Sequence, residues 1–391
     1  MEAKRRFHIA TEAELREGRV TDVYFERARS AIRARNADKV VVAEVRAKSL
    51  PNKWEWAVLA GVEEVARLLE GVDVRVWSLP EGSLFYAGEP VLLIEGPYTV
   101  FGHLETEILG MLCQASGVAT KAARCRVAAG KRTVLSFGAR RMHPAVAPMI
   151  ERACYIGGCD GVSTLLAAEV IGIPPSGTMP HALVLLLGDT VEAGWAFDQV
   201  AGPEVPRIVL IDTFLDEKFE AIRVAEALRE KLYGIRFDTP ASRRGDLRQL
   251  MEEVRWELDL RGFQHVKLFA SGGLDEYSIL DLNPVCDGYG VGTSLANAPT
   301  VNLALDLVEV GGEWIAKRGK ESGGKFVAAC PACGARKVVY WKHEPGVCEE
   351  CGQPRRFLNM LLIDGGRLPV DLPDAREIRQ SVLAQLDRVS L

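Results

Sequence analysis

The sequence contains no hydrophobic run long enough to cross a membrane, because its longest uncharged stretches are interrupted by Gly, Pro and Ser. It also lacks an excess of positive charge: 48 Lys and Arg stand against 53 Asp and Glu, a net charge of -5. We therefore expect neither a membrane nor a nucleic acid as partner. Residues 1–6 are charged and no apolar segment follows, so we expect no secretory signal and a cytoplasmic location.

The chain has 391 residues, enough for two or three domains with a sizeable core. Its 48% hydrophobic and 26% charged residues are typical of a soluble globular protein. Five cysteines are scattered among small apolar residues and are expected to be reduced core thiols, namely Cys113, Cys125, Cys154, Cys159 and Cys286.

The other four cysteines form two C-x-x-C pairs, Cys330 with Cys333 and Cys348 with Cys351, separated by fourteen residues. Four thiolates at this spacing predict a tetrahedral Zn²⁺ site, which is structural because no coordination position stays open. Nine Lys and Arg against four Asp and Glu in residues 317–356 also permit a nucleic-acid-binding ribbon. An accessory domain that stabilises the protein or contacts a second subunit is the favoured interpretation.

Changes of pattern along the chain predict three domains. Residues 1–105 form an α+β domain with a strand at 40–47 and a helix at 54–69. Residues 106–316 begin with a helix, from about Leu104 to Ala129, and continue as alternating strands and helices. Residues 317–391 form a small zinc-ribbon-like domain that ends in a helix at 377–389.

The alternation in the second domain predicts an α/β fold with a parallel sheet or barrel. The expected strands are 133–137, 160–163, 207–212, 234–238, 265–270 and 288–291. The expected helices are 145–155, 164–171, 181–200, 215–232, 246–261 and 275–282, the last of them shortened by Asn283-Pro284.

Charged residues and glycines follow these strands, where α/β barrels build their sites. Arg140 and Arg141 follow the first strand and offer forked donors that fit carboxylate and phosphate oxygens. The alternative is that both arginines form salt bridges to a neighbouring helix. Glycine loops follow two late strands and predict a phosphate site, with Ser271, Gly272, Gly273, Gly292 and Thr293 as its residues.

Asp212 and Asp238 end neighbouring strands, and Arg236 lies on the same strand face as Asp238. These carboxylates could bind Mg²⁺, hold ribose hydroxyls or stabilise a developing cation, or they could cap the following helices. Arg243 and Arg244 add positive charge on the next loop. His181 follows a Pro- and Gly-rich loop on the same side and is a candidate for an active-site role. Together these residues indicate a polyanionic, sugar-bearing ligand.

The ordered series TDVYFER, SFGARRMHP, GGCDGVS, GTMPHAL, IDTF, IRFDTPASRRGD, SGGLDE and GVGTS resembles nicotinate phosphoribosyltransferase, in particular the archaeal type. The resemblance implies a type II phosphoribosyltransferase fold, with an N-terminal α/β domain and an irregular α/β barrel. It implies that nicotinate and phosphoribosyl pyrophosphate (PRPP) give nicotinate mononucleotide and pyrophosphate in NAD salvage. It further implies coupling to ATP through a phosphorylated histidine, and a homodimer or higher oligomer with shared active sites.

The resemblance also assigns roles to residues. Phe137 and Tyr24 would stack on the two faces of the pyridine ring, with Asp22 and Tyr24 lent by the neighbouring subunit. Arg140 and Arg141 would lie near the nicotinate carboxylate and the PRPP phosphates, and His181 would be the phosphorylated histidine. The remaining assignments are Asp160 as an acid facing the base, Arg236 and Asp238 as the pair holding ribose and pyrophosphate, and Gly272, Gly273, Gly292 and Thr293 as the 5′-phosphate cradle.

The nicotinate nitrogen carries a lone pair, so no general base is needed, and catalysis consists of positioning with Mg²⁺ and arginine neutralising pyrophosphate. One alternative is a quinolinate phosphoribosyltransferase of the same fold. A substrate with two carboxylates needs a denser basic pocket, however, and the His181 loop fits the ATP-coupled nicotinate branch better. Another alternative is a zinc-ribbon interaction protein with a non-catalytic barrel, against which the complete set of arginines, acids and glycine loops argues.

Overall fold

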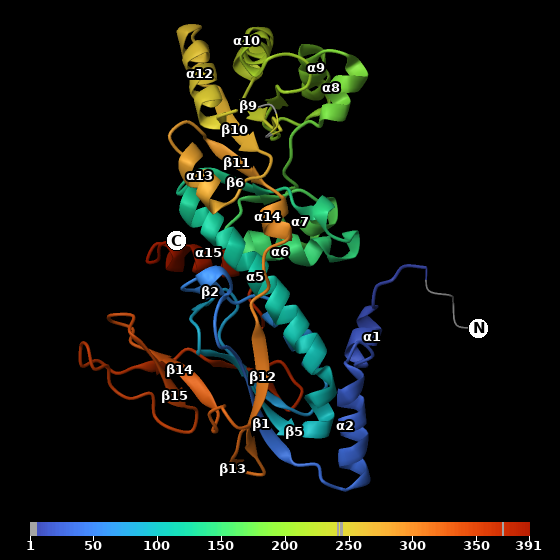
Figure 1. Cartoon of the computed structure of the whole chain (residues 1–391), viewed down its shortest axis with the longest axis vertical. Coiled ribbons are helices and arrows are strands. Elements are labelled where there is room, and N and C mark those ends of the chain that lie inside the picture. The colour runs from blue at the N-terminus through green and yellow to red at the C-terminus, as the bar shows by residue number, and fades with distance from the viewer. Residues whose placement is uncertain (1–5, 241, 243–244, 370) are drawn as a thin grey trace. The chain divides into compact units, whose positions relative to one another are not determined.

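The computed structural model describes residues 6–240, 242, 245–369 and 371–391. The chain divides into two compact units, and the first boundary between them falls within the long helix Glu105–Ala129 (Figure 1). The first unit extends to Thr120 and includes Pro299–Gln385, and the second comprises Lys121–Ala298 with Leu386–Leu391. No described helix combines the length and the apolar character needed to cross a membrane.

The first unit is built on a six-stranded antiparallel sheet of order β13-β12-β1-β5-β3-β17. Its strands are β1 (Val40–Ala47), β3 (Arg75–Ser78), β5 (Pro90–Pro97), β12 (Leu303–Val310), β13 (Glu313–Trp314) and β17 (Met360–Asp364). A separate pair consists of β2 (Ala57–Val58) and β4 (Leu84–Phe85). The helices are α1 (Glu12–Arg16), α2 (Val23–Ala34), α3 (Val62–Leu69), α4 (Tyr98–Phe101), α5 (Glu105–Ala129) and α15 (Ala375–Leu386).

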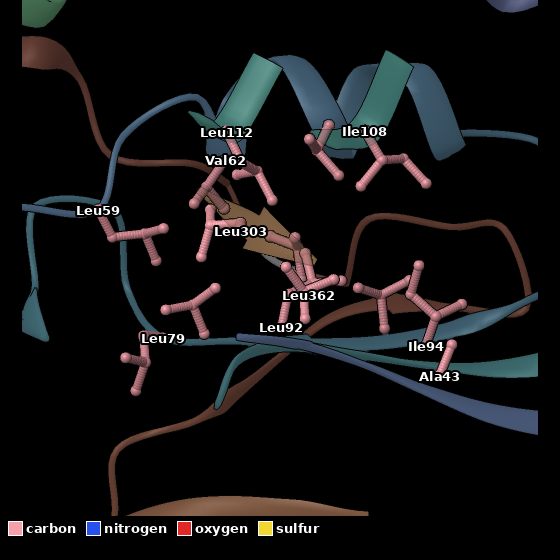
Figure 2. Packing of buried hydrophobic residues seen from close by; sticks show 14 of the residues in the cluster. Ala43, Leu59, Val62, Leu79, Leu92, Ile94, Ile108, Leu112, Leu303 and Leu362 are labelled. Atoms are coloured by element: carbon pink, nitrogen blue, oxygen red, sulfur yellow. The ribbon is translucent and has the colours of Figure 1, made fainter. Parts of the chain in front are cut away.

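One face of this sheet packs against α3 and the first half of α5. Figure 2 shows Val62 of α3 with Ile108 and Leu112 of α5 above Leu92 and Ile94 of β5. Apolar side chains recur on the inward face of each helix and at alternate strand positions, so burying them joins the layers. This cluster is the largest apolar core of the first unit.

The opposite face of the same sheet is covered by a three-stranded sheet of β14 (Lys325–Ala329), β15 (Arg336–Tyr340) and β16 (Arg356–Phe357). Phe326 of β14 packs against Val42 and Leu93, which point away from the helices. Arg336 of β15 donates two hydrogen bonds to the carboxylate of Glu89, both at 2.8 Å. The central strands are therefore buried on both faces, which explains why Val41–Val45 reads as an almost continuous apolar run.

The second unit contains a six-stranded parallel sheet of order β7-β6-β11-β10-β9-β8. Its strands are β6 (Thr133–Ser136), β7 (Gly161–Val162), β8 (Ile208–Leu210), β9 (Gly234–Phe237), β10 (Lys267–Ser271) and β11 (Gly288–Val291). The helices are α6 (Ala147–Ile156), α7 (Leu165–Ile171), α8 (His181–Leu187), α9 (Thr190–Val200), α10 (Glu217–Leu228), α12 (Leu247–Leu260), α13 (Glu276–Leu282) and α14 (Thr293–Ala296). Among the described strands β7 and β8 are edges, so the expected barrel is present as an open half-barrel sheet.

The predicted order of strands and helices is confirmed in the second unit, and α13 ends at Leu282, before Asn283-Pro284. Two predicted helices are wrong in extent. The segment 181–200 forms two helices, because Gly188 takes a left-handed conformation with φ +77° and Asp189 caps α9 through Val191 and Glu192. In the segment 54–69 only Val62–Leu69 is helical, because Ala57–Val58 pairs with β4.

Candidate active site

Parallel pairing brings the loops that follow the six strands to one edge of the sheet. Arg236 pairs with Phe269, and Ser271 pairs with Gly290, in neighbouring strands β9, β10 and β11. Side chains two residues apart on a strand point to the same face, so Arg236 and Asp238 share the face that carries Ser271. The side-chain contacts below follow from this register.

A buried arginine ties β9 to β10. Arg236 is only 9% exposed, and its Nη1 donates to Ser271 Oγ at 3.0 Å and lies 3.2 Å from Asp238 Oδ2. The hydroxyl of Ser271 donates in turn to Asp238 Oδ1 at 2.8 Å. The Nε of Arg236 has no partner among the described residues. Its Nη2 donates to the Met179 carbonyl at 3.3 Å, so the guanidinium is held through both Nη atoms and only the buried Nε lacks a partner in the described chain.

His181 joins this group from the start of α8. Its Nδ1 lies 3.1 Å from Thr213 Oγ1. Its Nε2 lies 3.7 Å from Asp212 Oδ2 and 3.5 Å from Asp238 Oδ2. Carboxylates only accept hydrogen bonds, so they favour a proton on Nε2, with the Thr213 hydroxyl donating to Nδ1. The imidazole therefore sits between two acids at the end of the sheet.

Asp212 is the most deeply placed acid of the cluster, with a side chain only 2% exposed. Its Oδ1 has no hydrogen-bond partner among the described residues. Burial raises the pKa of Asp212, and the neighbouring charge of Asp238 raises it further, while His181 opposes the shift. A buried carboxylate without full hydrogen bonding costs stability, so holding Asp212 in this position destabilises the fold.

Phe137 lies directly after β6, and its ring covers Gly290 of β11. A β-carbon added to Gly290 would overlap the Phe137 ring and would lie 3.3 Å from the Cβ of Ser271. The absence of a side chain at Gly290 therefore creates the space in which the ring lies, beside the strand that carries Ser271. This placement suits an aromatic surface at the edge of the anion-binding group.

Arg140 and Arg141 form the short helix η3 (Ala139–Arg141) after Phe137, and both are exposed. Within the described parts of the chain neither guanidinium has an ion-pair or hydrogen-bond partner. The salt bridges to a neighbouring helix, which the sequence left as an alternative, are therefore not found among those residues. Both side chains remain available for a ligand.

The glycine loops lie at the same edge. Gly272 and Gly273 follow β10 with φ angles of +84° and +73°, a conformation that other residues rarely adopt. A β-carbon on Gly272 would lie 3.1 Å from Asp238 Oδ1, so the loop passes close to the acid. Gly292 and Thr293 follow β11, and Thr293 is exposed at the start of α14. Backbone N–H groups in such loops can approach a phosphate closely.

Of the remaining predicted site residues, one lies at the other edge of the sheet, two belong to the first unit and two lie outside the described residues. Asp160 precedes β7 and therefore lies at the amino edge of the sheet, where it accepts from Arg126 at 2.8 Å and from the Val134 N–H at 2.9 Å. Asp22 and Tyr24 belong to the first unit, where Asp22 precedes α2 and Tyr24 is 58% exposed in its first turn. Arg243 and Arg244 lie outside the described residues.

Sequence reasoning missed two groups in the second unit. Thr213, the partner of His181, follows Asp212 directly and could have been included as a neighbour on the same loop. Glu151 on α6 is fully buried and accepts four hydrogen bonds from the N–H and hydroxyl groups of Ser163 and Thr164, at 2.6–2.9 Å. Those residues follow β7 at the carboxyl edge. No pattern in the sequence distinguishes Glu151 from other helix acids.

The four clustered cysteines converge in the first unit. Their sulfur atoms lie within 4.8 Å of one another, with Cys330 and Cys351 3.4 Å apart and Cys333 and Cys348 3.5 Å apart. A tetrahedron of sulfurs about 2.3 Å from zinc has edges of about 3.8 Å. Backbone N–H groups, first that of Cys333, lower the pKa of Cys330 to about 6, whereas burial and the neighbouring sulfurs raise the pKa of Cys333 and of Cys351, so without a metal ion the negative charge stays on Cys330. Among the described residues this is the one group of three or more potential ligands that could hold a metal ion.

Two sequence profiles match the chain. The N-terminal domain of quinolinate phosphoribosyl transferase matches residues 22–116, and the C-terminal domain of the same family matches residues 118–306. A crystal structure of nicotinate-nucleotide pyrophosphorylase from Pyrococcus furiosus has a TM-score of 0.97 at 52% identity and covers 99% of this chain and 100% of that one. The human nicotinic acid phosphoribosyltransferase structure has a TM-score of 0.74 over 95% of this chain and 94% of that one, and at 21% identity it shows the shared fold alone.

Curated relatives show which family of phosphoribosyltransferases the chain belongs to. Nicotinate phosphoribosyltransferase pncB2 of Mycobacterium tuberculosis is 36% identical over 337 residues, which cover 81% of this chain and 68% of that protein. Nicotinate phosphoribosyltransferase pncB1 of the same organism is 31% identical over 414 residues, covering 94% of this chain and 91% of that protein. The chain therefore belongs to the nicotinate phosphoribosyltransferase family.

Proposed function

We propose that this chain transfers the phosphoribosyl group of PRPP to nicotinate, giving nicotinate mononucleotide and pyrophosphate in NAD salvage. The C1–oxygen bond to pyrophosphate breaks and a C1–nitrogen bond forms with the lone pair of the pyridine nitrogen. The observation that carries the proposal is the joint location of Arg236, Asp238, His181 and a glycine loop at the carboxyl edge of one sheet. The family membership supports the same reaction.

Each part of this edge suits one part of the substrates. The guanidinium of Arg236, with Asp238, would hold pyrophosphate and ribose, and the loops at Gly272–Gly273 and Gly292–Thr293 would hold the 5′-phosphate. Phe137 would stack on the pyridine ring, and the unpaired Arg140 and Arg141 would bind the nicotinate carboxylate and PRPP phosphates. Catalysis would then rest on positioning and on neutralising the charge of the leaving group.

Asp212 would stabilise the oxocarbenium-like charge that develops on the ribose, or would bind Mg²⁺ together with the Asp238 carboxylate. Mg²⁺, when bound there, would neutralise pyrophosphate. His181 would accept the phosphoryl group that couples ATP hydrolysis to turnover. Its ring is already oriented by Thr213 at 3.1 Å, which supports this role.

A quinolinate phosphoribosyltransferase is the second candidate, since the matching profiles carry that name. Its substrate has one carboxylate more than nicotinate. The Pyrococcus furiosus relative is named a pyrophosphorylase. Such an enzyme uses pyrophosphate to cleave the bond that a phosphoribosyltransferase forms. That name agrees with the proposed reaction run backwards, and the 52% identity supports the archaeal type within the family.

The zinc site, the homodimer and the location are each proposed from a single feature of the chain. Zn²⁺ fits the four converging thiolates, each pair of which follows the C-x-x-C spacing. A homodimer with shared sites would explain why Tyr24, expected to face the pyridine ring, is exposed on the first unit. A cytoplasmic location follows from the metabolic role. A separate domain at residues 317–391 and a role for Asp160, Arg243 and Arg244 in the site stay predictions.

The proposed activity is tested by offering purified protein PRPP and Mg²⁺ with nicotinate, quinolinate or nicotinamide, each with and without ATP. We expect nicotinate mononucleotide from nicotinate, with more product when ATP is present. Absence of a nucleotide from nicotinate would exclude the proposal, and carbon dioxide release from quinolinate would favour the second candidate.

Replacing Arg140 with Ala should lower kcat/KM for nicotinate about 10- to 100-fold, because a charged hydrogen bond to the carboxylate is lost. Folding and zinc content should not change, since the side chain has no partner in the described structure. Arg248→Ala is the matched control, because that arginine pairs with Glu252 on the exposed face of α12. Equal kinetics for Arg140→Ala and the wild type would remove Arg140 from the site.

Asp212→Asn should lower turnover and raise the melting temperature at pH 7. A carboxyl whose pKa is raised on folding destabilises the protein as pH rises from the ordinary Asp value through the folded value. The stabilisation should therefore shrink as the pH falls toward about 4. Each kcal/mol corresponds to about 2–4 °C. The exposed Asp281→Asn serves as control, and an Asp212→Asn variant that melts below the wild type at pH 7 would contradict the argument.

Removing the proposed zinc should destabilise the first unit, because the thiolates join the two turns of the small ribbon. Elemental analysis should find one zinc ion per chain, and Cys333→Ser should lose it and lower the melting temperature. Cys113→Ser should keep the metal, since Cys113 lies in a partly buried position outside the cluster. Retention of zinc by the Cys333→Ser variant would show that the four thiolates are not the ligands.

A further inference from the structure

The segment between α7 and α8, residues 173–180, links one edge of the open parallel sheet to the group around Arg236; we call it the strap. Near its middle the N–H of Ser176 donates to the carbonyl of Val162 in edge strand β7 at 2.7 Å. Near its end the carbonyl of Met179 accepts from Arg236 Nη2 of β9 at 3.3 Å. In the sheet order, β6, β11 and β10 lie between these two strands. The strap is therefore attached at two separated points.

The first attachment depends on a missing side chain. A β-carbon added to Gly161 of β7 would lie 2.7 Å from the Cβ of Ser176, closer still to its Oγ, and 3.1 Å from a methyl group of Leu135. The φ angle of Gly161 is not positive, so glycine is needed there for space and not for backbone conformation. The Ser176 side chain occupies the space that a larger residue at position 161 would fill.

The second attachment leads directly to His181. Met179 is 1% exposed, so its side chain anchors the strap in the unit while its carbonyl meets Arg236. Pro180 then caps α8, and His181 is the first residue of that helix. Only Pro180 separates Met179 from His181, whose imidazole lies within 3.7 Å of both acids.

We propose that Gly161 and Ser176 are positioning residues for His181. The space left by Gly161 accommodates Ser176, and the strap, fixed in this way, holds the imidazole between Asp212 and Asp238. This proposal rests on the proposed function in one respect, namely that His181 takes part in turnover. It assigns the two residues no contact with a substrate. Their effect on the reaction passes entirely through the strap.

Gly161→Ala tests the gap and should push Ser176 away from β7. Displacing a catalytic group by about 1 Å can cost about 100-fold, so we expect kcat to fall about 10- to 100-fold, with a smaller change in KM for nicotinate. Ser176→Gly removes both atoms that the new methyl group would meet, leaving only the Leu135 contact at 3.1 Å. The double variant Gly161→Ala with Ser176→Gly should therefore recover most of the lost kcat.

A second readout does not depend on activity. The chain has six histidines, and the ring signals of ¹³C-labelled histidine can be followed by NMR, with His181→Ala identifying the His181 signal. Gly161→Ala should shift that signal, and the double variant should return it toward its wild-type position. Gly177→Ala is the matched control within the strap, because a β-carbon there meets no atom within 4 Å. It should leave the His181 signal and the melting temperature unchanged.

Three results would overturn the proposal. An unshifted His181 signal in Gly161→Ala would show that the gap does not position the ring. A shift that Ser176→Gly fails to reverse, or a Gly161→Ala variant that unfolds with or without Ser176→Gly, would show that Gly161 serves packing and not the strap. If wild-type protein makes no nucleotide from nicotinate while the signals behave as expected, the proposed function fails and the positioning of His181 stands.

Discussion

The parallel pairing of β9, β10 and β11 is the interaction on which the candidate site depends. It aligns Arg236 with Phe269 and Ser271 with Gly290, so residues far apart in sequence meet on one face of the sheet. The hydrogen bonds from Arg236 to Ser271 and from Ser271 to Asp238 follow from that register. A slip of one residue would send these side chains to the opposite face and separate the arginine from the acid.

The carboxyl edge of the parallel sheet holds charged side chains where little water reaches them. Asp212 keeps one oxygen without a partner, and burial raises the pKa of Asp212, so holding this carboxyl in place lowers the stability of the fold. Sites that bind polyanions and stabilise developing cations require such groups to be held ready before the ligand arrives. The missing side chains at Gly290 and Gly161 leave the space in which Phe137 and Ser176 lie.

The first unit is organised differently, because its central strands are covered on both faces. Helices α3 and α5 cover one face, and the three-stranded sheet that carries Phe326 covers the other. The four cysteines lie outside these two apolar clusters, and a metal held by their thiolates would stabilise the turns that carry them. Such a metal site would have a structural role that is independent of the chemistry in the second unit.

Local patterns were sufficient for much of the protein. Apolar runs bounded by glycine and charge predicted each strand of the parallel sheet within a few residues, and the spacing of four cysteines predicted that they would converge. Such features depend on residues close together in sequence. The order of the parallel strands does not, and neither does the side of the sheet on which a loop lies. The motif around Asp160 suggested a residue facing the base, yet pairing with β6 and Arg126 places it at the amino edge.

The sequence alone determined which residue types end the strands and therefore the polyanionic character of the ligand. Only the tertiary structure decided which of these residues meet, since strand pairing sets distances between segments that are far apart in the chain. It left Arg140 and Arg141 unpaired among the described residues, a question that their sequence context could not answer. It also placed Ser176 against Gly161. Packing between such distant residues depends on the space that a missing side chain leaves in three dimensions, and no periodic pattern in the sequence reveals that space.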